Sequence, residues 1–125
     1  MTESRNVGLT ITRMTVKELA ELLGLTVLCS EDNLGIEVAG GYAGDILSDA
    51  LAVLRENMVW ITVQSNANMV AVAAFRKAAA VILPKDVMPD EDTLAVARRE
   101  GVAILGSDRP AFETAGMIYA LLNGR

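Results

Sequence analysis

Along almost the whole chain, segments whose apolar residues have the spacing of a helix alternate with segments whose apolar residues have the spacing of a strand. The first clear segment covers residues 16–23, where apolar side chains recur every three or four positions. Thr15 and Glu18 have the spacing of a capping box, and Gly24 suits the left-handed end of a helix. The pattern therefore predicts a helix that begins after Thr15 and ends at Gly24.

Short apolar runs typical of strands follow this helix. Amphipathic segments typical of helices separate the later apolar runs from one another. The amphipathic segments end near Asn57, Arg76, Arg99 and Leu122, and the last has Phe112, Ala115, Tyr119 and Leu122 on its predicted inner face. The predicted strands are Leu25–Cys29, Ile36–Ala39, Met58–Val63, Ala79–Leu83 and Val102–Leu105.

Strands that alternate with helices of about ten residues are typical of βαβ units. We therefore expect an α/β fold, a single three-layer domain whose mainly parallel sheet is covered by helices. The domain is expected to span residues 15–125. Residues 1–14 form either an N-terminal tail or an edge strand, because Gly8–Thr12 alternates apolar and polar residues but lies close to the chain end.

The composition excludes several classes of function. The chain has 125 residues, one cysteine and no histidine, which excludes an internal disulfide, imidazole catalysis and a histidine zinc site. Its net charge of −5 argues against a nucleic-acid partner. Residues 1–6 lack the apolar core of a signal peptide, and no apolar run approaches the roughly 20 residues of a membrane span. We expect a cytoplasmic protein without a membrane partner.

The apolar content points to an association between copies of the chain. Apolar residues make up 52% of the sequence and charged residues only 22%. A small domain of this composition can hide part of its apolar surface in a homodimer.

A ligand site is expected at the carboxyl ends of the strands, where parallel sheets place their crevices. Four predicted loops lie there: Gly40–Asp45, Gln64–Asn68, Pro84–Pro89 and Gly106–Arg109. The first two have the compositions of binding loops. The candidate ligand-binding residues are Gly40, Gly41, Tyr42, Gly44, Asp45, Gln64, Ser65, Asn66 and Asn68.

The glycine-rich loop allows two interpretations. Its glycines permit backbone N–H groups to approach a phosphate or carboxylate, and Tyr42 could stack on a base. It lacks the lysine and hydroxyl of a P-loop, and Asp45 and Asp49 would repel an anion. The alternative is a tight strand-to-helix turn in which Asp45 caps the helix.

The second loop is rich in amides and hydroxyls. Gln64, Ser65, Asn66 and Asn68 can both donate and accept hydrogen bonds, which suits a nucleobase or a ribose. Capping of the next helix by Ser65 or Asn66 is the alternative, and both roles are compatible.

No catalytic group emerges from the sequence. Asp45 and Asp49 share a helical face and could hold a metal ion, but a surface acidic pair is the commoner arrangement. Trp60 lies in an apolar strand and is expected in the core, and Cys29 has no nearby cation to activate it. We therefore predict no metal site and no enzyme activity, and the cofactor is unknown.

Five stretches carry a resemblance to a known family: Val38–Asp49, Val59–Gln64, Val70–Ala73, Gly101–Ser107 and Phe112–Ala115. They resemble the small stand-alone DRTGG-domain proteins, and the similarity covers residues 15–122. The helix Thr15–Leu23 resembles the start of the related N-terminal domain of HPr kinase/phosphorylase. The Asp-Arg-Thr-Gly-Gly string itself is absent, and Gln64–Asn68 follows the central strand instead.

The resemblance implies a non-catalytic regulatory role. DRTGG domains also occur in phosphotransacetylases and between the CBS domains of inorganic pyrophosphatases, where they are accessory and associate in pairs. We therefore expect a ligand-sensing homodimer that binds a small metabolite or nucleotide at its strand-end loops. The alternatives are an adaptor module that docks on an enzyme partner without a small ligand, and a small enzyme acting on a phosphorylated substrate.

Overall fold

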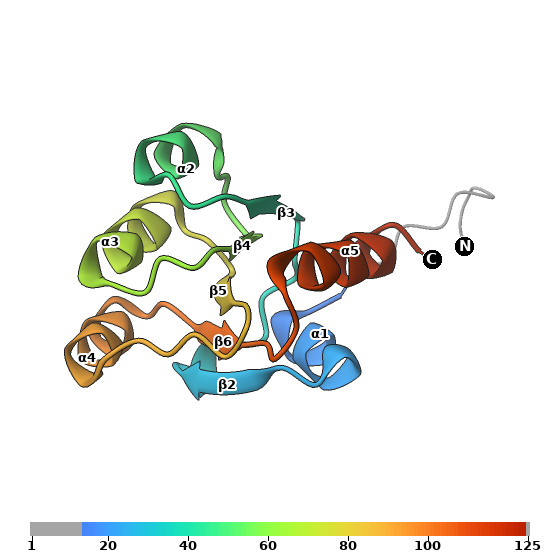
Figure 1. The fold of residues 1–125 in the computed structure, drawn as a ribbon, viewed down its shortest axis with the longest axis horizontal. Helices are drawn as coiled ribbons and strands as arrows, with labels where there is room; N and C mark the ends of the chain where they lie inside the picture. Colours follow the sequence, from blue (N-terminus) through green and yellow to red (C-terminus); the bar gives the residue numbers. More distant parts are fainter. Residues whose placement is uncertain (1–13, 125) are drawn as a thin grey trace.

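A five-stranded sheet with the strand order β2-β6-β5-β4-β3 organises the molecule. The computed structural model describes residues 14–124. In chain order its elements are α1 (Val16–Leu23), β2 (Thr26–Cys29), a 3₁₀ turn (Glu31–Asn33), β3 (Gly40–Ala43), α2 (Leu47–Val53), β4 (Met58–Ile61), α3 (Ala67–Arg76), β5 (Ala80–Leu83), α4 (Glu91–Glu100), β6 (Ile104–Gly106) and α5 (Ala111–Leu122) (Figure 1).

Four of the strands are parallel. β3, β4, β5 and β6 follow one another in the chain and in the sheet, and α2, α3 and α4 connect them. β2 pairs with β6 in the antiparallel direction. All four residues of β5, at the centre of the sheet, are buried. The expected α/β fold with a mainly parallel sheet is confirmed.

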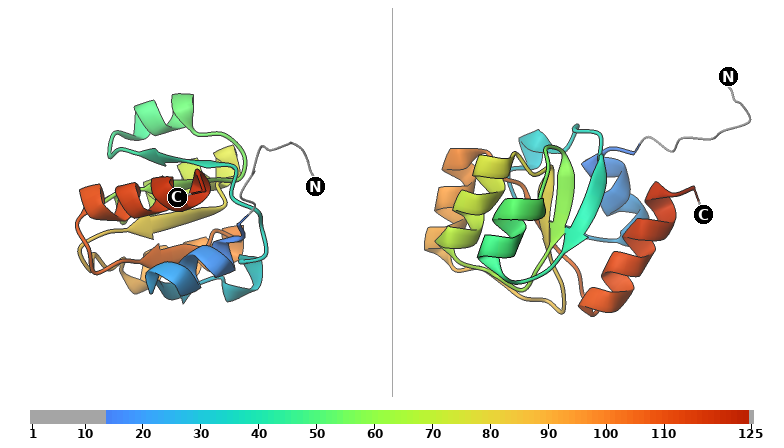
Figure 2. Two further views of the ribbon diagram at one scale, coloured as in Figure 1. Left: turned by 90° about the vertical axis from the view of Figure 1, so that its right-hand side faces the viewer. Right: turned by 90° about the horizontal axis from the view of Figure 1, so that it is seen from above.

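Helices cover both faces of the sheet and make three layers (Figures 1 and 2). α2, α3 and α4 lie on one face, and α1 and α5 lie on the other. Trp60, Val81 and Ile104 face the first group, whereas Val59, Ile82 and Leu105 face the second. Adjacent residues of one strand serve opposite layers because strand side chains alternate.

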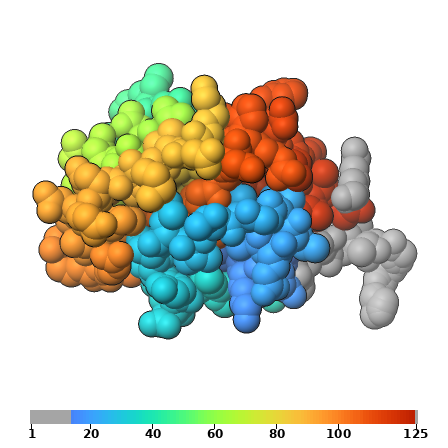
Figure 3. Space-filling model, turned by 60° about the horizontal axis from the view of Figure 1, so that its bottom comes forward, coloured from blue at the N-terminus to red at the C-terminus, as the bar shows by residue number. Residues whose placement is uncertain are grey.

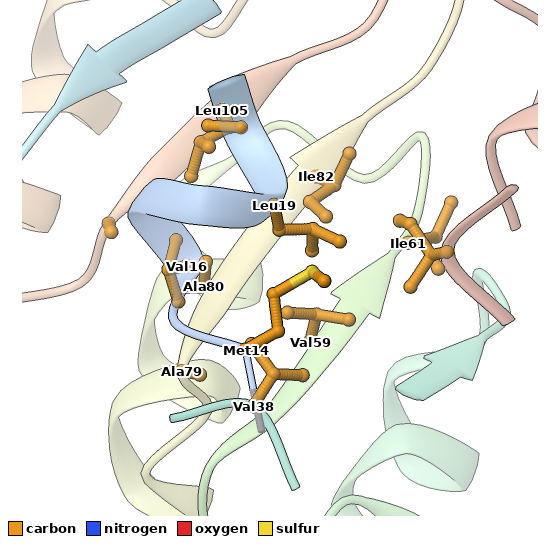
Figure 4. Packing of buried hydrophobic residues seen from close by; sticks show 13 residues of the cluster. Met14, Val16, Leu19, Val38, Val59, Ile61, Ala79, Ala80, Ile82 and Leu105 are labelled. Atoms are coloured by element: carbon orange, nitrogen blue, oxygen red, sulfur yellow. The ribbon is translucent and has the colours of Figure 1, made fainter. Parts of the chain in front are cut away.

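The core below α1 shows how the sequence pattern produces this packing. Leu19 is fully buried and points from α1 onto the strand residues Val59 and Ile82 (Figure 4). The predicted capping box is present, since Glu18 N donates to Thr15 Oγ1 at 3.1 Å and Thr15 N donates to Glu18 Oε1 at 2.9 Å. These two bonds satisfy backbone donors that the start of a helix would otherwise leave free.

The two ends of the described chain meet on one side of the molecule. Figure 3 shows the surface of the first segment, in blue, bordering that of the last, in red. Arg109 Nη1, just before α5, donates to the carbonyl of Leu23 at the end of α1, at 3.4 Å. α1 and α5 thus complete the third layer together.

The strand predicted at Ile36–Ala39 and the loop predicted at Gly40–Asp45 are both wrong. The strand is β3, Gly40–Ala43, and the preceding segment makes only an isolated antiparallel bridge between Thr15 and Glu37. Among residues 14–124, β3 pairs with β4 alone, and backbone hydrogen bonds hold this pair, so its pairing needs no apolar side chains. A pattern of apolar residues therefore could not reveal it.

The predicted inner face of the last helix is also wrong in part. Phe112 and Tyr119 are 89% and 67% exposed, whereas Thr114 and Ile118 are buried. α5 packs over β3 and β4, where the sheet ends in a strand that begins with two glycines. The sheet therefore offers no side chains to cover the outer half of this helix.

The predicted edge strand Gly8–Thr12 lies outside the described residues. Between residues 14 and 124, no helix is long and apolar enough to cross a membrane.

The packing of α1 can be tested with a matched pair of substitutions. Leu19→Ala removes a fully buried side chain and is expected to lower the free energy of unfolding by about 2–5 kcal/mol. Leu22→Ala changes a side chain that is 63% exposed in the same helix and should cost less than about 1 kcal/mol. Urea denaturation of both variants measures the difference, and equal losses would contradict the placement of α1.

Candidate functional site

The parallel strands bring four connecting segments to one edge of the sheet. β3 and β4 end at Ala43 and Ile61, and their connections begin at neighbouring positions because these two residues are paired. The connections after β5 and β6 also touch, since Lys85 N donates to the carbonyl of Arg109 at 2.9 Å. The expected convergence of loops at the carboxyl edge is therefore present.

Asp45 joins the end of β3 to the end of β4. Its Oδ1 accepts hydrogen bonds from Thr62 Oγ1 and from Val63 N, both at 2.9 Å. Thr62 is only 2% exposed, so its hydroxyl depends on this partner. Asp45 does not cap α2, as the turn interpretation required: Ile46 occupies the N-cap position, and no side chain bonds there.

Gln64 connects the two polar loops. Its Nε2 donates to the carbonyl of Asp45 at 2.7 Å, and its Oε1 accepts from Asn66 Nδ2 at 3.2 Å. Asn66 Oδ1 in turn accepts from Met69 N at 3.0 Å and caps α3, as expected. A continuous chain of hydrogen bonds thus runs from the β3 loop to the first turn of α3.

Trp60 and Tyr42 both contact Gly44. The fully buried Trp60 donates from Nε1 to the Gly44 carbonyl at 2.9 Å, which places it in the core as expected. A Cβ at Gly44 would lie 2.5 Å from the Tyr42 hydroxyl oxygen. Glycine is needed here because the tyrosine ring passes close to the backbone.

The Tyr42 hydroxyl donates to the carboxylate of Asp49 on α2. This hydrogen bond, together with burial and the negative charges of Asp49 and Asp45, raises the pKa of Tyr42 from 10.0 to about 12. The ring is therefore fixed between β3 and α2 rather than free to stack on a base.

The nine candidate residues fall into three groups. Gly40 and Gly41 belong to strand β3 and not to a phosphate-binding loop. Within residues 14–124, the side chains of Ser65 and Asn68 make no hydrogen bond, and Asn68 is exposed. The remaining residues organise the loops by hydrogen bonds or close contact: Tyr42, Gly44, Asp45, Gln64 and Asn66.

Sequence reasoning missed Thr62 and the role of Asp49. Thr62 was included in an apolar strand, and its bond to Asp45 spans 17 residues. The one signal in the sequence is a hydroxyl residue at the end of the strand, opposite a loop with a free carboxylate. Such a pair becomes recognisable only when the register of β3 on β4 is known.

Asp45 and Asp49, the two acidic residues beside β3, are engaged with protein donors. Asp45 bonds Thr62 and Val63, and Asp49 bonds Tyr42. In the described part of the chain, no group of three or more cysteine or acidic side chains could hold a metal ion. Cys29 is buried, and its Sγ lies 3.5 Å from the Val102 carbonyl.

An apolar groove of about 370 Å³ lies beside the polar edge, between the outer part of α5 and strands β3 and β4. Gly41, Ala43 and Ile61 form its floor, and the exposed rings of Phe112 and Tyr119 line its side. The groove exists because the described sheet does not reach under the outer half of α5, which also leaves these two rings exposed.

This arrangement defines a three-layer α/β domain with polar loops at the carboxyl edge of its sheet. The sequence profile of the DRTGG domain matches residues 18–121. The chain therefore belongs to the DRTGG domain family, as the sequence resemblance indicated. A search of curated proteins found no match.

The chain also resembles a solved regulatory structure, the CBS and DRTGG domains of Clostridium perfringens pyrophosphatase complexed with the activator diadenosine tetraphosphate. The TM-score is 0.66 at 12% sequence identity, over 94% of this chain and 54% of that one. At this identity the likeness shows the fold alone, and this chain corresponds to about half of the pyrophosphatase region.

The bridging role of Asp45 predicts a difference between two substitutions. Asp45→Ala leaves the buried Thr62 hydroxyl and the Val63 amide without their acceptor and should lower the free energy of unfolding by about 1–3 kcal/mol. Asp45→Asn retains an oxygen acceptor and should cost clearly less. Chemical denaturation of the two variants provides the test, and equal effects would exclude the bridge.

The Tyr42–Asp49 bond predicts a specific alkaline titration. Since the hydroxyl ionises near pH 10 when the chain is unfolded and near pH 12 when it is folded, the free energy of unfolding should fall between these values. Tyr119→Phe leaves Tyr42 as the only tyrosine, so absorbance near 295 nm reports its ionisation. Adding Asp49→Asn should lower this pKa, and an unchanged value would contradict the contact.

Proposed function

We propose that the domain is a non-catalytic sensor that binds a small metabolite or nucleotide at the loops following β3 and β4. The observation that supports this function best is the meeting of two polar loops at the carboxyl edge, tied together by Gln64. Beside this link, the side chains of Ser65 and Asn68 make no hydrogen bond to any residue between 14 and 124. Fixed loops with a few free polar groups are typical of ligand sites.

The charges at this edge favour one orientation for a nucleotide. Asp45 and Asp49 place negative charge near β3, which repels phosphate groups. Lys85 and Arg109 follow β5 and β6, and their segments touch. The base and ribose would therefore contact Ser65 and Asn68, with the phosphates directed toward Lys85, because Arg109 Nη1 already donates to the Leu23 carbonyl.

The likeness to a pyrophosphatase region complexed with diadenosine tetraphosphate supports a regulatory role and suggests adenine nucleotides as first ligands. In this proposal the domain acts in the cytoplasm, and ligand binding is relayed to an enzyme partner. Its own residues orient the ligand, and no nucleophile paired with a base is part of the mechanism.

Homodimer formation is the second part of the proposal. α5 contains one charged residue, Glu113, and presents the rings of Phe112 and Tyr119 to solvent. A face with so little charge allows two copies, each with a net charge of −5, to approach. Sedimentation velocity should show a dimer that Phe112→Glu weakens, and a monomer at every concentration would contradict this part.

The ligand part can be tested by calorimetric titration with diadenosine tetraphosphate, ATP and AMP. We expect one of these to bind, and Ser65→Ala with Asn68→Ala should weaken binding at least tenfold, about 1.4 kcal/mol, through lost hydrogen bonds. The melting temperature should remain near that of the unchanged chain, because neither side chain has a hydrogen-bond partner in the described part of the chain.

Ser48→Ala is the matched control, since Ser48 is exposed on α2 and its side chain also lacks a bonding partner within residues 14–124. This variant should bind as the unchanged chain does. If none of the three nucleotides binds, the adenine-nucleotide proposal fails. An adaptor function, with docking through the apolar groove, then becomes the better explanation.

A further inference from the structure

Helix α5 lies in the outer layer of the molecule (Figure 2) and is apolar on more sides than the described sheet covers. Ile118 is buried in the core, whereas Phe112, Gly116 and Tyr119 are exposed. The three exposed residues lie four and three positions apart, so they form one line along the helix. Glu113 is the only charged residue of α5. Helices that are apolar on all sides are typically buried on all sides.

The exposed line, which borders the apolar groove, has a hollow at its centre. A Cβ added at Gly116 would meet no atom of the described chain within 4 Å. Phe112 and Tyr119 stand about one turn before and one turn after this hollow, and they are 89% and 67% exposed. Glycine is less favourable than alanine inside a helix, and the space around Gly116 does not require it. A glycine at such a point allows another backbone to approach closely.

We propose that two copies of the chain pair through antiparallel α5 helices, with the two-fold axis passing beside Gly116. This inference rests on the proposed homodimer and specifies how its two copies meet. In an antiparallel pair, a residue before the axis meets a residue about equally far behind the axis in the other copy. Phe112 precedes Gly116 by four positions, and Tyr119 follows it by three. Each Phe112 ring therefore meets the partner's Tyr119.

Shape and charge make a second copy the fitting occupant of this face. A hollow with a ring on each side is complementary to an identical line turned by 180°, as a two-fold interface requires. The hollow also lets the two helices approach closely enough for the rings to pack against each other. Glu113 lies three positions before the axis, so it faces the region of the partner's Tyr119 and not the partner's Glu113. Two copies with a net charge of −5 thus meet without like charges in direct opposition.

The position of the axis can be tested with Gly116→Leu. Since the space around Gly116 is open, a single copy accommodates the leucine, and its melting temperature at low concentration should not fall. In the dimer the same side chain fills the hollow and keeps the two helices apart. Sedimentation velocity should therefore show a dimer dissociation constant raised at least about tenfold. An unchanged dissociation constant would overturn the pairing at Gly116.

Gly35→Leu is the matched control. Gly35 is also exposed, and a Cβ added there also meets no atom of the described chain within 4 Å. It lies between the 3₁₀ turn and β3, outside α5. This variant should dimerise as the unchanged chain does, because it adds the same side chain away from the proposed contact. Equal weakening of the dimer by both substitutions would count against an axis at Gly116 and overturn it.

NMR of a mixture of differently labelled chains tests the contact between the rings. The sequence contains two phenylalanines and two tyrosines, so labelling half of the chains at phenylalanine and half at tyrosine gives few signals. Phe112 and Tyr119 of one copy lie about 10 Å apart along the helix axis, too far for a strong nuclear Overhauser effect. The mixture should show this effect between the two rings of different copies. Phe75→Leu should retain it, which assigns the phenylalanine signal to Phe112.

The failure of this pairing is distinguishable from the failure of the homodimer. A chain that is monomeric at every concentration would contradict both. A dimer that Phe112→Glu weakens, but that tolerates Gly116→Leu or shows no Overhauser effect between the Phe112 and Tyr119 rings, would retain the homodimer through α5. That result would overturn only the antiparallel pairing at Gly116.

Discussion

The pairing of a glycine-rich edge strand with β4 is the constraint on which the candidate site depends. It places Asp45 next to the end of β4, where one carboxylate oxygen serves the buried hydroxyl of Thr62 and the amide of Val63. Gln64 then joins the two loops, and Asn66 continues the link to α3. Without this pairing, the polar residues would belong to separate loops and could not form one candidate site.

Local signals in the sequence were sufficient for much of the fold. The capping box at Thr15, the helix end at Gly24 and the apolar strands determined the element types, and their alternation determined the layers. β3 could not be predicted because it is held by its backbone. The sequence also could not predict that Phe112 and Tyr119 are exposed, because their exposure depends on how far the sheet extends under α5 and not on the spacing of residues along α5.

The sequence predicted where the candidate loops lie, but not which of their residues bond one another and which do not. The rule that ligands bind at the carboxyl ends of parallel strands selected the loops after β3 and β4. Only the structure distinguishes residues that bond each other, such as Asp45 and Gln64, from Ser65 and Asn68, whose side chains have no partner in the part of the chain it describes. The partners of Asp45 lie 17 and 18 residues away, beyond the range of local patterns.

The central claim is that the linked loops of β3 and β4 form the ligand site of this DRTGG domain. NMR chemical-shift mapping during titration with diadenosine tetraphosphate tests it most directly. The account predicts saturable shifts centred on the amides of Val63, Ser65 and Asn68, with little change around the 3₁₀ turn at Glu31–Asn33, which follows β2 at the far edge of the sheet. Saturable shifts centred elsewhere, with those three amides unmoved, would contradict it.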